Sequence, residues 1–119
     1  MKHSIPKELI AYIKPKTAFI FSKSSCPSCV SAKSLFKVLE IPFKEKEVNT
    51  NPKPTDNEGL EFLGVLHAHS GIKTFPKIYL GEKCIGGYSD MLQLKKSQKL
   101  FEMLKKDEIP FADSEHFRT

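Results

Sequence analysis

The first half of the chain alternates between short apolar runs and segments in which apolar residues recur at helical spacing. Residues 17–22 are almost continuously apolar, which is typical of a central strand covered on both faces. From Pro27 to about Glu40 the apolar positions recur every three or four residues, and Pro42 follows, which predicts a helix that ends there. Residues 43–48 are rich in charge and predict an edge strand. A strand, a helix and a strand in this order predict a right-handed βαβ unit with parallel strands.

A loop and a further helix follow this unit. Residues 50–56 contain two prolines between polar residues, which is typical of a loop. Asp56 or Asn57 can cap a helix that reaches about Ser70, and Gly71 is placed to end that helix.

A β-hairpin and two helical segments complete the pattern. Residues 76–80 and 83–85 are short strand-like runs joined by a two-residue turn that contains glycine. Ser89 is predicted to cap the next helix, and Ser97 is predicted to restart it as a second segment that reaches Lys106.

The pattern divides the chain into one main region with two extensions. Residues 5–14 place apolar side chains on one face and predict a short helix within an N-terminal region, residues 1–15. The regular pattern covers residues 16–106, and residues 107–119 form a tail of mixed polarity that we expect to be partly mobile. The order α-β-α-β-α-β-β-α-α predicts a single α/β domain, with a four-stranded mixed sheet flanked by helices on both faces.

Composition and charge restrict the class of protein. The 119-residue chain is 39% hydrophobic and 28% charged, as is ordinary for a globular domain. No apolar run approaches the roughly 20 residues of a membrane span, so we expect no membrane partner. The net charge of +5 comes from lysine, because Arg118 is the only arginine. Arginine carries most base-specific recognition, so we interpret the charge as a solvated lysine surface and expect no nucleic-acid partner.

The cysteine content suggests a compartment. Three cysteines are too few for the disulfide framework of a secreted protein, and the N-terminus lacks the apolar core of a secretion signal. We therefore expect a reducing, cytoplasmic environment. A close cysteine pair in such an environment is catalytic, redox-sensing or metal-binding.

The motif Cys26-Pro27-Ser28-Cys29 joins the predicted 17–22 strand to the helix that follows. As the N-cap residue, Cys26 would face unpaired backbone N–H groups, which lower a thiol pKa below its free value of about 8.5. Lys23 adds positive charge, and Cys29, one turn inside the helix, is placed to resolve a mixed disulfide. The alternative is half of a zinc site, but no second pair of ligands has suitable spacing. Redox chemistry is the preferred interpretation, and we expect no metal.

Two later motifs suggest a binding surface. Thr74-Phe75-Pro76 is compatible with a cis X–Pro bond, which would leave the Phe75 backbone groups free to pair with a peptide thiol. Taken alone, this proline fits an ordinary strand edge better. The other motif is Gly86-Gly87-Tyr88-Ser89-Asp90. Its glycines allow a ligand to approach the backbone closely, its predicted helix start offers N–H groups to a carboxylate, and Asp90 can bind an ammonium. Together these groups suit a γ-glutamyl group, which carries both charges. The alternative for this motif is a plain helix cap.

Together the three motifs resemble a glutaredoxin over residues 16–106. The resemblance implies a thioredoxin fold and a glutathione-disulfide oxidoreductase, acting in electron transport and cell redox homeostasis with glutathione as co-substrate. It implies that Cys26 is the nucleophile, that Cys29 resolves dithiol reactions, and that the partners of a monomeric protein are glutathione and disulfide-bearing or glutathionylated proteins. The glutathione-binding residues that it implies are Lys23, Cys26, Lys73, Thr74, Phe75, Pro76, Gly87, Ser89 and Asp90.

Some positions depart from the family's commoner residues. Ser28 stands where many dithiol members have tyrosine, Phe75 where valine is commoner, and Leu63 near a position that often carries glutamine. Cys84 is either an additional thiol or, as is more usual for a strand cysteine, a small buried apolar residue.

Two other functions are compatible with the motifs. In one, an iron–sulfur cluster is held between two protomers by Cys26 and two glutathiones, although related cluster-binding proteins usually lack a proline at the Pro27 position. In the other, the chain is a thioredoxin-type reductant, although the aromatic-Cys-Gly-Pro-Cys motif typical of that family is absent.

Overall fold

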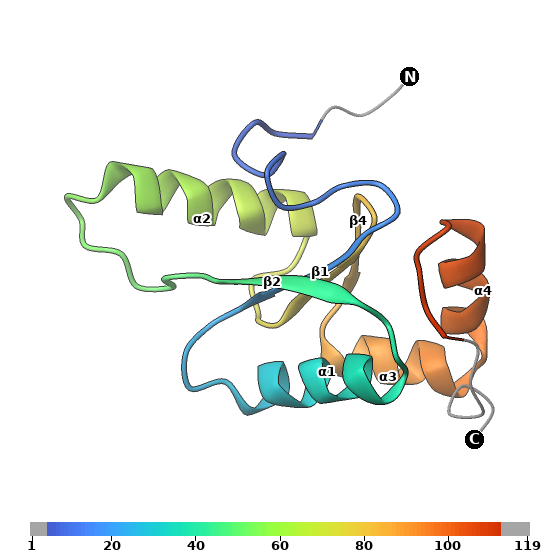
Figure 1. Ribbon diagram of the computed structural model, residues 1–119. Coiled ribbons are helices and arrows are strands. Elements are labelled where there is room, and N and C mark those ends of the chain that lie inside the picture. The colour runs from blue at the N-terminus through green and yellow to red at the C-terminus, as the bar shows by residue number, and fades with distance from the viewer. Residues whose placement is uncertain (1–4, 113–119) are drawn as a thin grey trace.

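The computed structural model describes residues 5–112, in which four strands and four helices form one mixed sheet with helices on both faces (Figure 1). In the sheet order β2-β1-β3-β4, β1 runs parallel to β2 and antiparallel to β3, and β3 runs antiparallel to β4. The predicted βαβ unit, edge strand and hairpin are therefore confirmed. The elements are β1 (Ala18–Ser22), α1 (Pro27–Val38), β2 (Phe43–Glu47), α2 (Asn57–Ser70), β3 (Lys77–Leu80), β4 (Lys83–Gly86), α3 (Tyr88–Lys96) and α4 (Lys99–Lys106).

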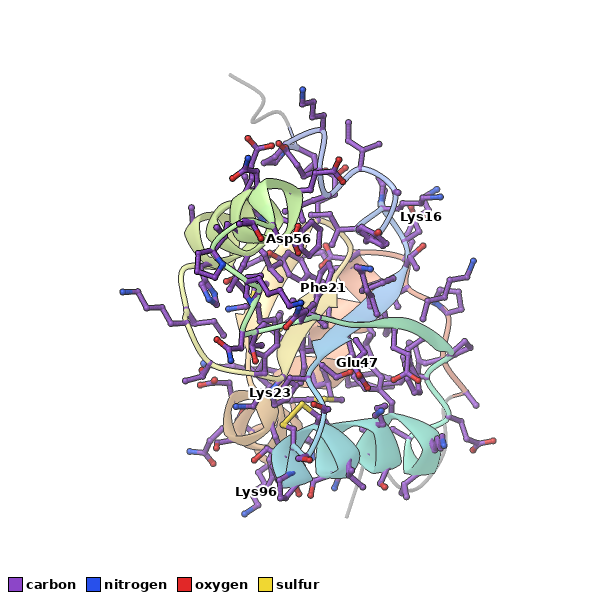
Figure 2. All side chains as sticks on the ribbon, turned by 90° about the vertical axis from the view of Figure 1, so that its left-hand side faces the viewer. Lys16, Phe21, Lys23, Glu47, Asp56 and Lys96 are labelled. Atoms are coloured by element: carbon purple, nitrogen blue, oxygen red, sulfur yellow. A yellow bond between two sulfur atoms is a disulfide. The ribbon has the colours of Figure 1, made fainter. Side chains whose placement is uncertain are left out.

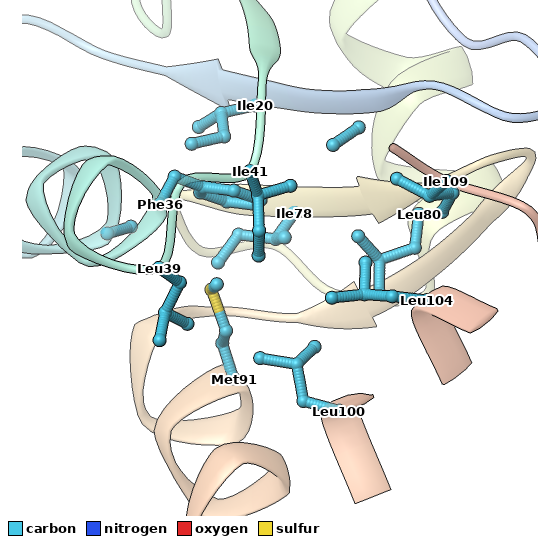
Figure 3. Packing of buried hydrophobic residues seen from close by; sticks show 12 residues of the cluster. Ile20, Phe36, Leu39, Ile41, Ile78, Leu80, Met91, Leu100, Leu104 and Ile109 are labelled. Carbon is cyan, nitrogen blue, oxygen red and sulfur yellow. The ribbon is translucent and has the colours of Figure 1, made fainter. Parts of the chain in front are cut away.

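Two apolar clusters cover the two faces of the sheet. Because side chains alternate along a strand, Ile20 and Ile78 point into one cluster and Phe21 and Tyr79 into the other. The first cluster joins the sheet to α1, α3 and α4, and Figure 3 shows its packed side chains. The second cluster is rich in aromatic rings and joins the sheet to α2 and the N-terminal segment. All five residues of β1 are buried, as the sequence predicts for a central strand.

The N-terminal segment corrects one expectation. Residues 5–14 do not form the predicted helix; they form consecutive turns, with Leu9 N–H donating to the Pro6 carbonyl and Ile13 N–H donating to the Leu9 carbonyl. Leu9 and Ile13 are nevertheless buried in the aromatic cluster. A helix of about ten residues is only marginally stable by itself. The backbone conformation of this segment therefore depends on the packing of Leu9 and Ile13 onto the sheet.

Two predicted helix starts shift along the chain. The N-cap of α3 is Gly87 and not Ser89, because the Asp90 carboxylate accepts the Gly87 N–H at 2.8 Å and closes the first turn from its third position. The N-cap of α4 is Gln98 and not Ser97, with Gln98 in the left-handed region at φ 69°. The α2 prediction is confirmed, with Asp56 as its N-cap and Gly71 in the left-handed conformation at its end.

The C-terminal tail is packed as far as it is described. Ile109 is buried in the first cluster, Phe111 packs against that cluster, and the Ala112 N–H donates to the Glu40 carbonyl. These contacts attach residues 107–112 to the domain, and the expected mobility of the tail stays a prediction. Residues 1–4 and 113–119 lie outside the described part of the chain, and so does that expectation for the end of the tail.

We predict that the N-terminal segment is an integral part of the folded domain. Leu9 is fully buried, whereas the next residue, Ile10, is 56% exposed. Leu9→Ala should lower the free energy of unfolding by about 2–5 kcal/mol, because it removes buried methyl groups and leaves a cavity. The matched control Ile10→Ala should change that free energy by less than about 0.5 kcal/mol. Urea unfolding of both variants measures the difference, and equal effects would contradict the prediction.

Candidate active site

The cysteine motif lies at the start of α1, directly after the end of β1. Cys26 and Cys29 form a disulfide there, and their Cα atoms are 5.2 Å apart. Cys26 is the N-cap residue, and its Sγ accepts the Cys29 N–H at 3.2 Å. Cys26 is 8% exposed and Cys29 is 2% exposed, so Cys29 is the less exposed residue of the pair, as the sequence predicted. Figure 2 shows the yellow disulfide beside Lys23.

Local sequence explains why the chain turns into a helix at this point. The Ser22 carbonyl still accepts the Val48 N–H at 2.7 Å, and the chain then leaves the sheet through an exposed turn with Ser25 at φ 54°. Pro27 takes the first helical position, where the missing N–H would have no partner in the helix. The sulfur of Cys26 consequently occupies the place of a capping oxygen.

The second motif meets the first in space. The Phe75–Pro76 peptide bond is cis, as the sequence suggested, and the Phe75 carbonyl oxygen lies 3.8 Å from the Cys26 sulfur. In the disulfide this sulfur carries no proton. In the reduced protein the Cys26 thiol can donate a hydrogen bond to the Phe75 carbonyl. Phe75 is therefore next to the reactive sulfur, although the two residues lie far apart in the sequence.

The third motif adjoins the second. A Cβ added at Gly87 would lie 3.4 Å from the Pro76 carbonyl oxygen, so the chain passes close to the cis proline at this glycine. Ser89 and Asp90 are exposed in the first turn of α3, and the Asp90 carboxylate is already engaged in the cap. The γ-glutamyl interpretation and the helix-cap interpretation therefore involve the same carboxylate.

The remaining predicted binding residues, Lys23, Lys73 and Thr74, are exposed near these motifs. Lys23 and Cys26 line a surface hollow of about 530 Å³ at the start of α1. Lys73 and Thr74 are exposed in the segment that leads into Phe75. The structure thus brings Cys26, Phe75, Pro76 and Gly87 together, and the roles of the other residues in glutathione binding stay predictions.

Sequence analysis missed a buried lysine beside this site. Lys77, the first residue of β3, is fully buried, and its Nζ donates to Ser70 Oγ at 3.1 Å and to the Ile72 carbonyl. The same ammonium lies 4.8 Å from the centre of the Phe75 ring. Burial lowers the pKa of Lys77 to about 8. The available signal was a lysine at the start of a buried strand, directly after the predicted cis proline.

His67 lies next to this lysine. Burial lowers the pKa of His67, and the charge of Lys77 lowers it further. Its ring lies 6.0 Å from that of Phe75, and within residues 5–112 its buried Nδ1 has no hydrogen-bond partner. Its ring contact is with the Phe75 segment and not with the cysteines.

Cys84, the third cysteine, is a free thiol on β4, away from the cysteine pair. It is partly buried against the aromatic cluster, and burial raises the pKa of its thiol. A second hollow, of about 690 Å³, includes Cys84 and His69 and is lined by neither Cys26 nor Phe75. Both interpretations of Cys84, as an additional thiol and as a small apolar residue, therefore stay predictions.

Residues 5–112 contain no group of three or more histidine, cysteine or acidic residues that could hold a metal ion, and none of their helices is long and apolar enough to cross a membrane.

Comparisons with known proteins agree with the geometry. The family model described as glutaredoxin matches residues 18–85, which is more than half of the chain. Human glutaredoxin-1 is 30% identical over 93 residues, covering 78% of this chain and 86% of the human protein. The crystal structure of a wheat glutaredoxin has a TM-score of 0.67 at 34% identity, covering 88% of this chain and 97% of that one.

A buckwheat glutaredoxin, solved as a complex with glutathione, has a TM-score of 0.64 at 26% identity and covers 78% of this chain and 81% of that chain. These similarities confirm the predicted thioredoxin fold. The paired cysteines at the start of α1 fit the dithiol type and indicate a thiol–disulfide oxidoreductase. By its family match, its relatives and its cysteine pair, the chain belongs to the glutaredoxin family.

Proposed function

We propose that the protein is a glutathione-dependent oxidoreductase that reduces protein disulfides and glutathione mixed disulfides through a Cys26 thiolate. The main support is the position of the Cys26 sulfur, which caps α1 at its N-terminus and lies 3.8 Å from the Phe75 carbonyl. A helix N-terminus stabilises a thiolate, and the Phe75 backbone beside it can pair with the backbone of a thiol peptide. The solved complex of a buckwheat glutaredoxin with glutathione supports the choice of peptide.

The monothiol reaction requires only Cys26. Its thiolate attacks the glutathione sulfur of a mixed disulfide, so that a Cys26–glutathione disulfide forms and the target protein leaves as a thiolate that takes up a proton. A second glutathione thiolate attacks the bound glutathione sulfur. Glutathione disulfide leaves, and the Cys26 thiolate is regenerated.

The dithiol reaction also uses Cys29. The Cys26 thiolate attacks one sulfur of a protein disulfide, and the Cys29 thiolate then attacks the Cys26 sulfur. The target leaves as a dithiol, and the Cys26–Cys29 disulfide of the present structure forms. Two glutathiones reduce that disulfide and are released as glutathione disulfide.

In this proposal the three motifs bind different parts of glutathione. The backbone of Phe75, beside Pro76, pairs with the cysteine of glutathione, and Thr74 lies in the same segment. The exposed ammonium groups of Lys23 and Lys73 attract its glycine carboxylate. The γ-glutamyl end is held by the start of α3, through Gly87, Ser89 and Asp90, where helix N–H groups and a carboxylate suit its two charges.

We predict that the two cysteines have separable roles. Cys26→Ser should abolish both reactions, because no thiolate remains to attack. Cys29→Ser should retain removal of glutathione from mixed disulfides and lose mainly the reduction of protein disulfides. Turnover of the glutathione–cysteine mixed disulfide, measured with glutathione and glutathione reductase, tests the first reaction. Reduction of a protein disulfide under the same conditions tests the second.

The matched control is Cys84→Ser, which changes the third thiol without touching the pair and should retain both reactions. Full turnover of the mixed disulfide by Cys26→Ser would refute the assignment. Activity with thioredoxin reductase and none with glutathione would instead support a thioredoxin-type reductant. A brown dimer after anaerobic reconstitution with iron and sulfide would support cluster binding.

We also predict that the reduced Cys26 thiol ionises at a lower pH than a free thiol. Alkylation by iodoacetamide, measured between pH 4 and 10 in the Cys29→Ser, Cys84→Ser double variant, should have its midpoint below the free value of about 8.5. The reason is the positive end of α1 and the Cys29 N–H that donates to the Cys26 sulfur. A midpoint at or above the free value would contradict the proposed attack by Cys26.

A further inference from the structure

Lys77 is an unusual residue to find at the start of a buried strand. Its side chain has no exposed surface, and among residues 5–112 its ammonium forms no ion pair with a carboxylate. Burial of an unpaired charge is costly, and a methionine of similar length would fill the same space without that cost. Stability therefore gives no reason for a lysine here.

The ammonium of Lys77 connects β3 to the end of α2 and to the loop that follows it. Its Nζ donates to Ser70 Oγ and to the Ile72 carbonyl, and it lies over the face of the Phe75 ring. Ser70 Oγ also accepts the Ile72 N–H at 3.3 Å. We call this set of contacts the Lys77 clamp; it is made by Ser70, Ile72, Phe75 and Lys77.

The clamp holds the segment that adjoins the reactive sulfur. Residues 72–75 contain no regular secondary structure, and they end at the carbonyl that lies 3.8 Å from Cys26 Sγ. Lys73 and Thr74, within the same segment, are exposed, so the segment is held from its buried side, by the clamp and by the packing of Phe75 against the aromatic cluster and His67. The position of the Phe75 backbone consequently depends on groups that hold the segment from its buried side.

We propose that Lys77 is a positioning residue that acts through the Lys77 clamp, holding the Phe75 backbone in the place where it binds glutathione. The inference rests on the proposed function for its substrate. Lys77 itself contacts neither the sulfur nor the ligand, and its effect is on binding and not on the chemical step.

The charge of Lys77 is sensitive to pH in the range where the enzyme can be assayed. Because the pKa of Lys77 is lowered to about 8, the side chain is protonated at pH 6.5. It loses its charge as the pH rises through about 8. The neighbouring titratable groups are His67, Cys84 and Tyr79, with Lys73 and His69 farther out. Burial lowers the pKa of His67 below 6.5 and raises those of Cys84 and Tyr79 above their ordinary values, so none of these three titrates near 8.

The first test compares Lys77→Met with the unchanged protein at pH 7. The KM for the glutathione–cysteine mixed disulfide should rise about tenfold, because hydrogen bonds from a charged donor to the binding segment are lost, while kcat changes less than about threefold. Thermal unfolding should show no loss of stability. The matched control is Lys46→Met on β2, which removes an ammonium 5.1 Å from the Tyr12 ring, outside the clamp, and should leave KM unchanged.

The second test follows pH. Between pH 6.5 and 9.5 the ratio of KM in Lys77→Met to KM in the unchanged protein should fall, with a midpoint near 8, because the unchanged protein loses its ammonium. Taking the ratio cancels titration of the substrate and of Cys26. A ratio that does not vary with pH, or an unchanged KM in the folded variant, would overturn the inference.

The third test does not depend on activity. Hydrogen–deuterium exchange of the amides of residues 72–75 should be faster in Lys77→Met, while exchange in α1 and β1 is unchanged. If Lys77→Met does not fold, Ser70→Ala removes one acceptor of the clamp and should raise KM two- to threefold; no rise would overturn the inference. Absence of turnover in the unchanged protein would refute the proposed function, whereas normal turnover with unchanged exchange would refute the clamp alone.

Discussion

The antiparallel pairing of β1 with β3 is the constraint on which the site depends. Its register places Phe21, near the end of β1, opposite Lys77, the first residue of β3. The chain that leaves β1 toward Cys26 and the chain that enters β3 from Phe75 therefore lie at the same end of the sheet. Because both strands are buried on both faces, a slip of one residue would turn apolar side chains toward the wrong cluster. The distance between the Cys26 sulfur and the Phe75 carbonyl is thus a consequence of core packing.

The same packing brings the third motif to this end of the sheet. Ile78 pairs with Gly86, so the chain that leaves β4 passes beside Pro76 before α3 begins. A glycine is required at position 86, since its φ is 110° and an added Cβ would collide with the Asp90 carboxylate. One end of the sheet thus brings together a sulfur, a carbonyl and a helix N-terminus from three separate stretches of sequence.

Lysines on the surface of this domain differ in role from the one lysine buried in the described residues. Most lysines are exposed, as expected for a solvated surface, and Lys23 and Lys73 supply positive charge near the cysteine pair without cost of burial. Lys77 is the exception, because its ammonium is buried and is satisfied by a hydroxyl and a carbonyl. A buried charge of this kind costs stability, so we associate it with the site that it supports.

Local sequence determined the features that depend on neighbouring residues. The sequence predicted Cys26 as a helix cap, Pro27 in the first turn, Asp56 and Gly71 as the ends of α2, and β2 as an edge strand, because each depends on spacing within one turn or one strand. The three motifs together, and not the cysteine motif alone, carried the resemblance to the family.

Tertiary structure alone decided the features that depend on distant contacts. The N-terminal segment has helical spacing, but burial of Leu9 and Ile13 against the sheet gives it turns instead. The start of α3 moved to Gly87 because Asp90 reaches back to that N–H. Lys77 looked like one more surface lysine, and only the closure of α2 over β3 buries it and gives it Ser70 and Ile72 as partners. Spacing along a chain records local geometry, whereas burial is set by which elements the core brings together.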